Sequence, residues 1–393
     1  MDTKKNISRI GMQEQKGQRG QLEELRAWLR LTLEPGIGSV TAKNLLMQFG
    51  FPQTIFETKF SQLMPVVGEK IAYQLREPCS EEINTQIDKT LEWLNQDNHH
   101  ILTLADTLYP KALLDTYDPP LLLYVDGNLS AFQKPAIAVV GTRHPTLNGA
   151  QNARAFGKYL ASQGWCIVSG LAKGIDASAH EGALLANVDC PTIAVMGTGI
   201  NRLYPAENKA IALGIRHRGA LISEFPLDTP ANAFRFPMRN RIVAGLSRGV
   251  LVVEAARKSG SLITAKMAGD LGKEIFAIPG SIHSPLSRGC HALIRQGAKL
   301  VETAQDILEE LGYAVTANAP EPDKPSVDPE IPEKFKPVLE AMGFEAISIE
   351  ELTEYLSLSI EELSLLLTEM QLQSIVVKQV DGKYQRVFHN GEN

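Results

Sequence analysis

The sequence predicts an α/β fold whose core is a Rossmann-like, doubly wound parallel sheet. The first observation is a series of short apolar runs: Ala136–Val140, Cys166–Ser169, Thr192–Met196, Ala220–Ser223, Val250–Glu254 and Glu274–Ile278. The second is that helix-like segments of about 10–18 residues separate most of them. Runs that are apolar on both faces are typical of strands covered by helices on both sides. Ligands of such sheets bind beyond the carboxyl ends of the strands.

The region before this core is expected to contain a polar, disordered leader over residues 1–20 and a helical domain over residues 21–99. Within it, Glu34–Val40 precedes a helical pattern and resembles a helix-hairpin-helix element, in which glycine amides at a helix N-terminus meet a phosphate. The alternative is that Gly36 and Gly38 only make a tight turn between packed helices.

The region after the core begins with a proline-rich, acidic segment, residues 313–331, which is typical of an exposed linker. Residues 332–393 then show three helical patterns, followed by two short strand patterns around Asp381-Gly382, a strong hairpin signal. Three helices and a hairpin predict a winged-helix domain. The core domain therefore extends over residues 100–312.

Charge is distributed unevenly along the 393 residues. The whole chain has 39 basic and 45 acidic residues, yet residues 134–312 hold 20 basic against 13 acidic, a net charge of +7. A basic domain attracts polyanions, unless this excess arose by chance. Residues 331–393 have a net charge of −6, and the predicted recognition helix holds Glu361, Glu362 and Glu369 without Lys or Arg. The winged helix is therefore expected to bind a protein or to regulate the core more than it contributes to DNA binding.

Composition and missing motifs argue against several classes of protein. No apolar run approaches the roughly 20 residues that a membrane span needs, and the N-terminus has no apolar signal core. The four cysteines, Cys79, Cys166, Cys190 and Cys290, show no CxxC spacing, so we expect reduced thiols, no metal site and a cytoplasmic protein. No P-loop is present, and Gly197-Thr198-Gly199 lacks the third glycine of a dinucleotide site, so no cofactor is predicted.

Small residues follow several of the predicted strands. They include Gly141 after the first strand, Ser169 and Gly170 at the end of the second, and Ser259 and Gly260 after the fifth. Glycine permits close approach of the backbone, and amides at helix N-termini bind anions. Their recurrence at one edge of the sheet predicts a site for a phosphate-bearing ligand.

Cations and aromatic residues accompany these turns. Arg143 and Lys173 follow the first two strands, and Arg239, Asn240 and Arg241 follow the fourth. Arginine suits phosphates because its planar fork donates twice and stays charged. The alternative for these arginines is a salt bridge to Glu224 or Glu254. Phe234 and Phe236 are candidates for base stacking, and the alternative for each is packing in the core.

These motifs together resemble the DprA/Smf family. The resemblance covers about residues 100–312 and rests on Tyr109-Pro110-Lys111, Val140–Arg143, Ser169–Asp176 with His180, Gly197–Gly199 with Tyr204-Pro205, Ser223-Glu224, Phe236–Arg241, Glu254 with Ser259–Thr264, and Pro279-Gly280 with Gly297-Ala298. It implies a single-stranded DNA (ssDNA)-binding protein that protects incoming strands and helps load the RecA recombinase in natural transformation or homologous recombination. It also implies a homodimer formed through the core, and no catalytic step.

The alternative is an enzyme of the nucleotide phosphoribohydrolase type, which shares a Rossmann-like fold. In that family a carboxylate follows a glycine-rich loop, but here Ile263 and Thr264 stand in its place. An apolar side chain cannot serve as a general acid or base. Among the remaining candidates, Asp176 is expected to cap the following helix and His180 to pack on it, while Glu224 and Glu254 complete no recognisable dyad. No catalytic residue is therefore assigned.

Overall fold

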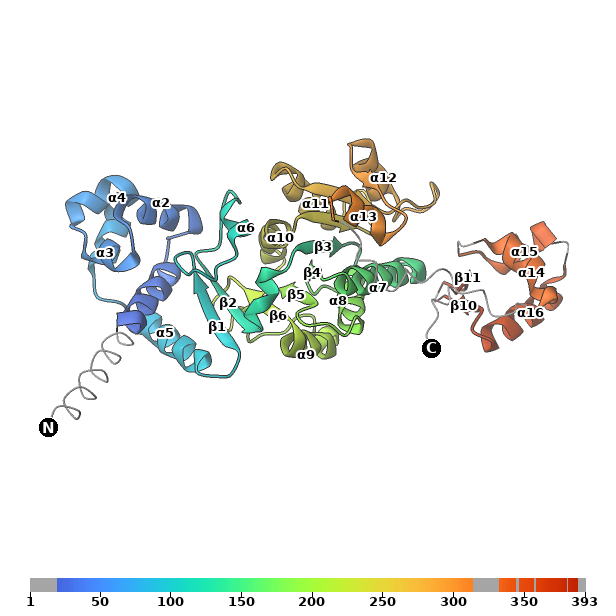
Figure 1. Cartoon of the computed structure of the whole chain (residues 1–393), viewed down its shortest axis with the longest axis horizontal. Helices are drawn as coiled ribbons and strands as arrows, with labels where there is room; N and C mark the ends of the chain where they lie inside the picture. The colour runs from blue at the N-terminus through green and yellow to red at the C-terminus, as the bar shows by residue number, and fades with distance from the viewer. Residues whose placement is uncertain (1–19, 314–331, 344–345, 357, 380, 388–393) are drawn as a thin grey trace.

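The computed structural model describes residues 20–313, 332–343, 346–356, 358–379 and 381–387, arranged as helices, a central sheet and a small C-terminal unit (Figure 1). The predicted leader before residue 20 and the predicted linker over residues 314–331 lie outside the described residues.

All six predicted strands are present and form most of the parallel part of one nine-stranded sheet. Their bounds are β3 Ala136–Val140, β4 Cys166–Ser169, β5 Thr192–Val195, β6 Ala220–Ser223, β7 Gly249–Val252 and β8 Glu274–Ala277. Together with β1 (His99–Thr103), β2 (Leu122–Gly127) and β9 (Lys299–Leu300), they give the sheet order β1-β2-β6-β5-β4-β3-β7-β8-β9, in which every pairing from β6 through β9 is parallel. The chain order reverses beside β3, so a crevice is expected at the carboxyl ends of β3, β4 and β7.

Three strands of the sheet were not predicted. β1 (His99–Thr103) pairs antiparallel with β2 (Leu122–Gly127), and β2 pairs antiparallel with β6. β9 (Lys299–Leu300) has only two residues and extends the opposite edge beside β8. The sheet is therefore mixed, with an antiparallel edge on a parallel core, as is common in large α/β sheets.

Helices cover both faces of the sheet, which explains the continuous apolar runs. On one face, Ile137 and Val139 of β3 pack with α7 (Leu147–Ser162) and α8 (Ile175–Leu185). On the other face, Ala138 and Val140 pack with α10 (Arg235–Leu246), α11 (Ser261–Asp270) and α12 (Arg288–Arg295). Alternate residues of one strand thus bury into opposite layers. α9 (Lys209–Arg218) packs in a third cluster beside β2, β5 and β6.

The N-terminal region is helical, as predicted. A first helix over residues 20–33 is followed by α2 (Ser39–Phe49), α3 (Pro52–Glu57), α4 (Phe60–Arg76) and α5 (Glu81–Leu94). Gly36 has φ +80°, which favours glycine in the turn before α2. The Ser39 hydroxyl at the start of α2 donates to the Asp118 carboxylate at 2.9 Å. A side chain of the core therefore already lies at this helix N-terminus.

The C-terminal unit is a winged helix with its own core. It comprises η3 (Glu333–Phe335), α14 (Lys336–Met342), α15 (Ile349–Leu356), α16 (Ile360–Leu372) and the antiparallel pair β10 (Val376–Lys378) and β11 (Tyr384–Arg386). Leu352, Leu363, Leu367 and Met370 pack together with Phe335 in a separate apolar cluster. Among the described helices, none is both long and apolar enough to cross a membrane.

Candidate functional site

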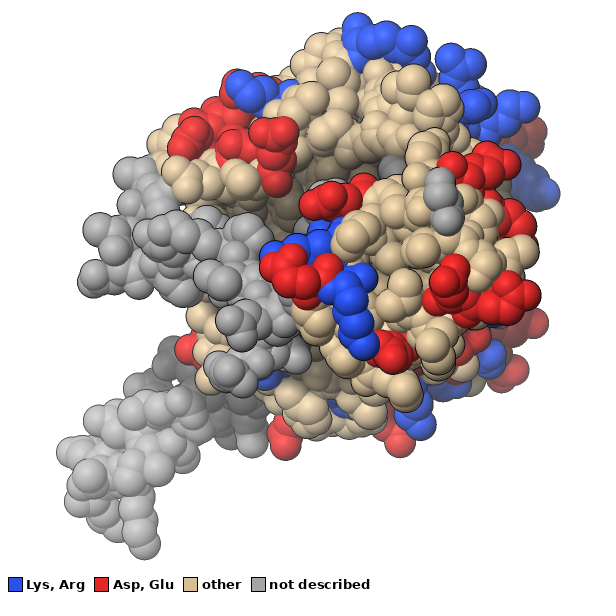
Figure 2. All heavy atoms as spheres, turned by 90° about the vertical axis from the view of Figure 1, so that its right-hand side faces the viewer, with Lys and Arg blue, Asp and Glu red and all other residues tan. Residues whose placement is uncertain are grey.

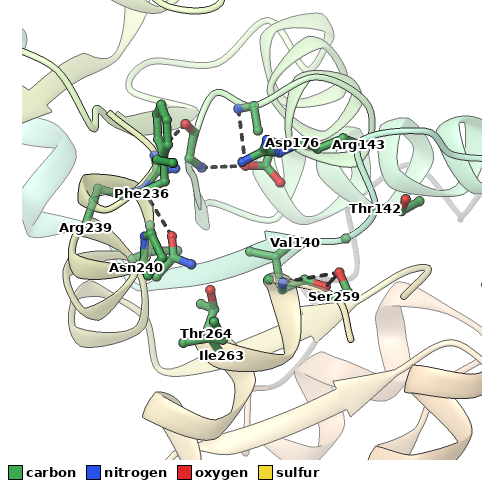
Figure 3. A pocket seen from close by; sticks show the side chains of 18 of the residues that line it. Val140, Thr142, Arg143, Asp176, Phe236, Arg239, Asn240, Ser259, Ile263 and Thr264 are labelled. Atoms are coloured by element: carbon green, nitrogen blue, oxygen red, sulfur yellow. Dashed lines mark hydrogen bonds between the residues drawn. The ribbon is translucent and has the colours of Figure 1, made fainter. Parts of the chain in front are cut away.

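A pocket of about 600 Å³ lies where the strand order predicts it, beyond the carboxyl ends of the strands around β3 (Figure 3). Its lining comes from five segments distant in sequence: the loop after β3, the loop after β4, Tyr204, the N-terminal part of α10, and the loop before α11. Of the predicted site residues, it brings together Gly141, Arg143, Gly170, Phe236, Arg239, Asn240, Ser259 and Gly260.

Arg143 is an exposed cation of this pocket. It follows β3 directly, and its guanidinium carbon lies 5.8 Å from the centre of the Phe236 ring (Figure 3). No carboxylate among the described residues forms an ion pair with it. Its charge is therefore available to an anion that enters the pocket.

Two aromatic rings form a stack beside Arg143. The rings of Phe236 and Tyr204 lie 5.6 Å apart at 30°, and Tyr204 remains 50 % exposed. Phe236 rests against Gly197, where an added Cβ would come within 2.7 Å of the ring. Gly197 thus makes room for the aromatic ring. Phe234, the second predicted stacking residue, is 72 % exposed and does not line the pocket.

Arg239 is an internal residue of the site. It is only 4 % exposed, and its guanidinium donates to the carbonyl oxygens of Gly170 and Val195 at the ends of two strands. Its guanidinium also occupies the space that a side chain at position 170 would need. Burial lowers the pKa of Arg239 to about 10, so it stays protonated at neutral pH, and the nearby Asp176 carboxylate favours the charged form. Arg239 therefore links the chain at Gly170 to the chain at Val195 and stabilises this side of the pocket.

Asp176 orders the loop after β4 rather than capping α8, so the expected cap is wrong. Its carboxylate accepts from the amides of Gly170 (3.1 Å) and Ala172 (3.3 Å), whereas Gly174 is the N-cap residue and makes no side-chain cap. Burial raises the pKa of Asp176, and Arg239 and the two amides oppose that shift. His180 is fully buried against Thr192, with Nδ1 2.7 Å from the hydroxyl, and burial lowers its pKa to about 3.

Three other predicted site residues have different partners. Arg241 forms an ion pair with Glu224, with both nitrogens bonded at 3.0 and 2.5 Å, so the salt-bridge alternative holds for this arginine. Lys173 pairs with Glu207 and does not line the pocket. Ser169 is fully buried and donates to the carbonyl of Val139 at 2.6 Å. The structure therefore leaves Ser169, Lys173 and Arg241 outside the open pocket.

The remaining wall is the turn before α11. Ser259 and Ser261 share a hydrogen bond between their hydroxyls at 2.7 Å, and Gly260 has open space where a side chain would stand. Asn240 also lines the pocket, and its side-chain oxygen accepts from the Arg239 Nε at 3.2 Å. Exposed backbone and hydroxyls at a helix start suit a phosphate oxygen.

The carboxylates considered for the enzyme alternative all have structural partners. Glu254 accepts from the amide and the hydroxyl of Thr146 at 2.9 and 2.5 Å, at the N-terminus of α7. Glu224 is held by Arg241, and Asp176 by the loop after β4. No group of three or more His, Cys, Asp or Glu within the described ranges is arranged to hold a metal ion.

Several pocket residues were missed by the sequence analysis. Tyr204, His144, Asn232 and Lys258 all line the pocket. The sequence feature that could have identified Tyr204 is its place in a Tyr-Pro pair after a predicted strand. Lys258 directly precedes the predicted Ser259 and Gly260, which was the signal for it. Asn232 lies in a loop whose course depends on packing, so no local pattern pointed to it.

Two models of known protein families match most of the chain. The model of the family described as DNA recombination-mediator protein A matches residues 100–312, and the DprA winged helix domain model matches residues 319–382. Protein Smf of Escherichia coli is 42% identical over 309 residues, covering 77% of this chain and 81% of its own length. Protein Smf of Synechocystis is 32% identical and covers 91% of this chain and 98% of its own.

Solved structures agree with this placement. The X-ray structure of DNA processing protein A (DprA) from Streptococcus pneumoniae has a TM-score of 0.62 and 37% identity, covering 72% of this chain and 95% of that one. DNA processing protein A from Helicobacter pylori, described for its unique ssDNA-binding mode, has a TM-score of 0.50 and 31% identity, covering 55% of this chain and 98% of that one.

Proposed function

The chain belongs to the DprA/Smf family of DNA recombination-mediator proteins, and from that premise we propose that its central pocket binds ssDNA. The observation that carries this proposal is the exposed guanidinium of Arg143, which has no ion-pair partner among the described residues and lies beside the ring stack of Phe236 and Tyr204. A cation that meets the phosphate backbone and rings that stack on bases are the two parts of a single-strand site.

The pocket geometry favours a single strand over a duplex. The stacked rings of Phe236 and Tyr204 line a pocket of about 600 Å³, and only an unpaired base can present its own face to an aromatic ring. Open backbone at Gly260 and the hydroxyl of Ser259 stand on the opposite wall for a phosphate. The similarity to the Helicobacter pylori protein supports the same ligand class.

The wider role follows from family membership. We propose that the protein protects ssDNA and helps load the RecA recombinase in natural transformation or homologous recombination, as a cytoplasmic homodimer joined through the core. It does so without a catalytic step, since Glu224, Glu254 and Asp176 serve as structural partners.

A binding comparison across salt concentrations tests the function. We expect ssDNA to bind more tightly than duplex of the same sequence. If about four phosphates are neutralised, the logarithm of affinity should fall with the logarithm of salt concentration with a slope near −3. Fluorescence anisotropy with labelled oligonucleotides measures both. Equal affinity for the two forms, or no dependence on salt, would contradict the proposal.

A second prediction concerns the winged helix. Its apolar core is separate from those of the rest of the chain, and its exposed faces carry acids such as Glu350, Glu354 and Glu361. A chain ending near Asn318 is expected to keep most of the ssDNA affinity, because these carboxylates repel phosphates. A loss of more than about tenfold, or about 1.4 kcal/mol, in the anisotropy assay would refute the idea that this domain serves protein contacts or regulation.

A further inference from the structure

A second group of exposed cations lies beside the pocket. It comprises Arg257 and Lys258 in the loop after β7, and Arg288 and Arg295 on α12; we term these four residues the outer basic surface. All four are exposed, and within the ranges that the structure describes none of them forms an ion pair. Figure 2 shows Lys and Arg side chains gathered along the top of the molecule, where Figure 1 places α12.

Backbone hydrogen bonds hold the two parts of this surface together. The amide of Ala255 donates to the carbonyl of Leu286 at 2.7 Å, and the amide of Gly289 donates to the carbonyl of Ala255 at 2.7 Å. The contact is so close that a Cβ at Gly289 would lie 2.5 Å from that carbonyl oxygen. The first turn of α12 is therefore fixed against the loop that carries Arg257 and Lys258.

The packing of α12 sets the direction of its two arginines. Cys290 and Leu293 are buried in the apolar cluster on this side of the sheet. Arg288 and Arg295 are two helical turns apart, so they share the opposite, exposed face, separated by about 10 Å along the axis. They extend the line of charge away from the pocket.

Three other exposed cations of the core have carboxylate partners, in contrast to these four. Lys173 pairs with Glu207, Arg154 with Glu181, and Lys299 with Glu310. The outer basic surface has no such neutralisation from described residues, and it is continuous with the pocket because Lys258 lines both. A row of unneutralised cations that continues a binding pocket is suited to a polyanion.

We propose that the outer basic surface binds the phosphate backbone of the ssDNA that leaves the pocket past Lys258. The strand then runs from the Arg143 side of the pocket across the loop after β7 and along α12. This inference rests on the proposed function and adds to it the path of the bound strand outside the pocket. A cationic groove that tracks the backbone, next to a stacking site, is how single strands are held without sequence preference.

The test uses the full chain and oligothymidines of about 6 and about 20 nucleotides, so that only the longer one extends beyond the pocket. The Arg288→Gln/Arg295→Gln variant is expected to bind the longer strand about fivefold more weakly, with a salt slope flatter by about 1.4. Its affinity for the shorter strand should be unchanged. The control, Arg154→Gln/Lys158→Gln, removes two cationic side chains, of which Arg154 is paired with Glu181, from exposed positions of α7 on the opposite face of the sheet, and should change neither affinity.

Unchanged affinity of Arg288→Gln/Arg295→Gln for the longer strand, or an equal loss in the α7 control, would overturn the proposed path. Failure of the function itself gives a different result. In that case the unaltered chain would bind neither oligothymidine, or Arg143→Ala would bind the shorter one as well as the unaltered chain does.

Discussion

Replacing Arg239 with methionine is expected to lower the free energy of unfolding by about 3 kcal/mol. The guanidinium donates to the buried carbonyl oxygens of Gly170 and Val195, and methionine leaves both without this donor. A hydrogen bond from a charged group contributes about 1.5–3 kcal/mol, and the loss of buried partners adds a desolvation cost. The Asp176 carboxylate also loses the positive charge that favours its ionised form.

Urea denaturation followed by circular dichroism measures this change. Arg239→Lys keeps the charge but loses the planar fork, so it should lie between the unaltered chain and Arg239→Met. Because Asp176 and Arg239 interact, the double variant Asp176→Asn/Arg239→Met should lose less free energy of unfolding than the two single variants lose together. A loss below about 1 kcal/mol for Arg239→Met would show that the arginine is not a structural brace.

Arg143→Ala is expected to weaken ssDNA binding by about tenfold at low salt. The lost interaction is a charge-assisted contact of about 1.5 kcal/mol between an exposed guanidinium and a phosphate. Because one phosphate contact disappears, the salt slope should become flatter by about 0.7. The change should leave the free energy of unfolding nearly unaltered, since Arg143 has no ion-pair partner in the described part of the chain.

Two companion variants sharpen the Arg143 experiment. Arg143→Lys keeps the charge and should retain the salt slope while losing part of the affinity, because lysine lacks the planar fork. Lys173→Ala removes a cation that is already paired with Glu207 and lies outside the pocket, so it should change the slope little. An unchanged salt slope in Arg143→Ala, or an equal change of the slope in Lys173→Ala, would contradict the assignment of Arg143 to the ssDNA site.

The two arginines illustrate how far sequence reasoning reaches. Both follow predicted strand ends and both suit phosphates, so no local pattern separates them. The structure assigns them different surroundings: Arg143 is exposed beside Phe236, whereas Arg239 is 4 % exposed beneath Gly170. Aromatic stacking was predicted for Phe236, but its partner Tyr204 was found only through the pocket geometry.

The sequence by itself determined the layered α/β core, because burial on both faces of a strand requires a continuous apolar run and turns at strand ends require small residues. It also determined which segments end at the edge of the sheet where the pocket lies, since parallel strands share one carboxyl edge. Only the tertiary structure decided which cations are free. Charge pairing depends on the distance between side chains far apart in the chain, such as Arg241 with Glu224 and Lys173 with Glu207, and no periodicity encodes that distance.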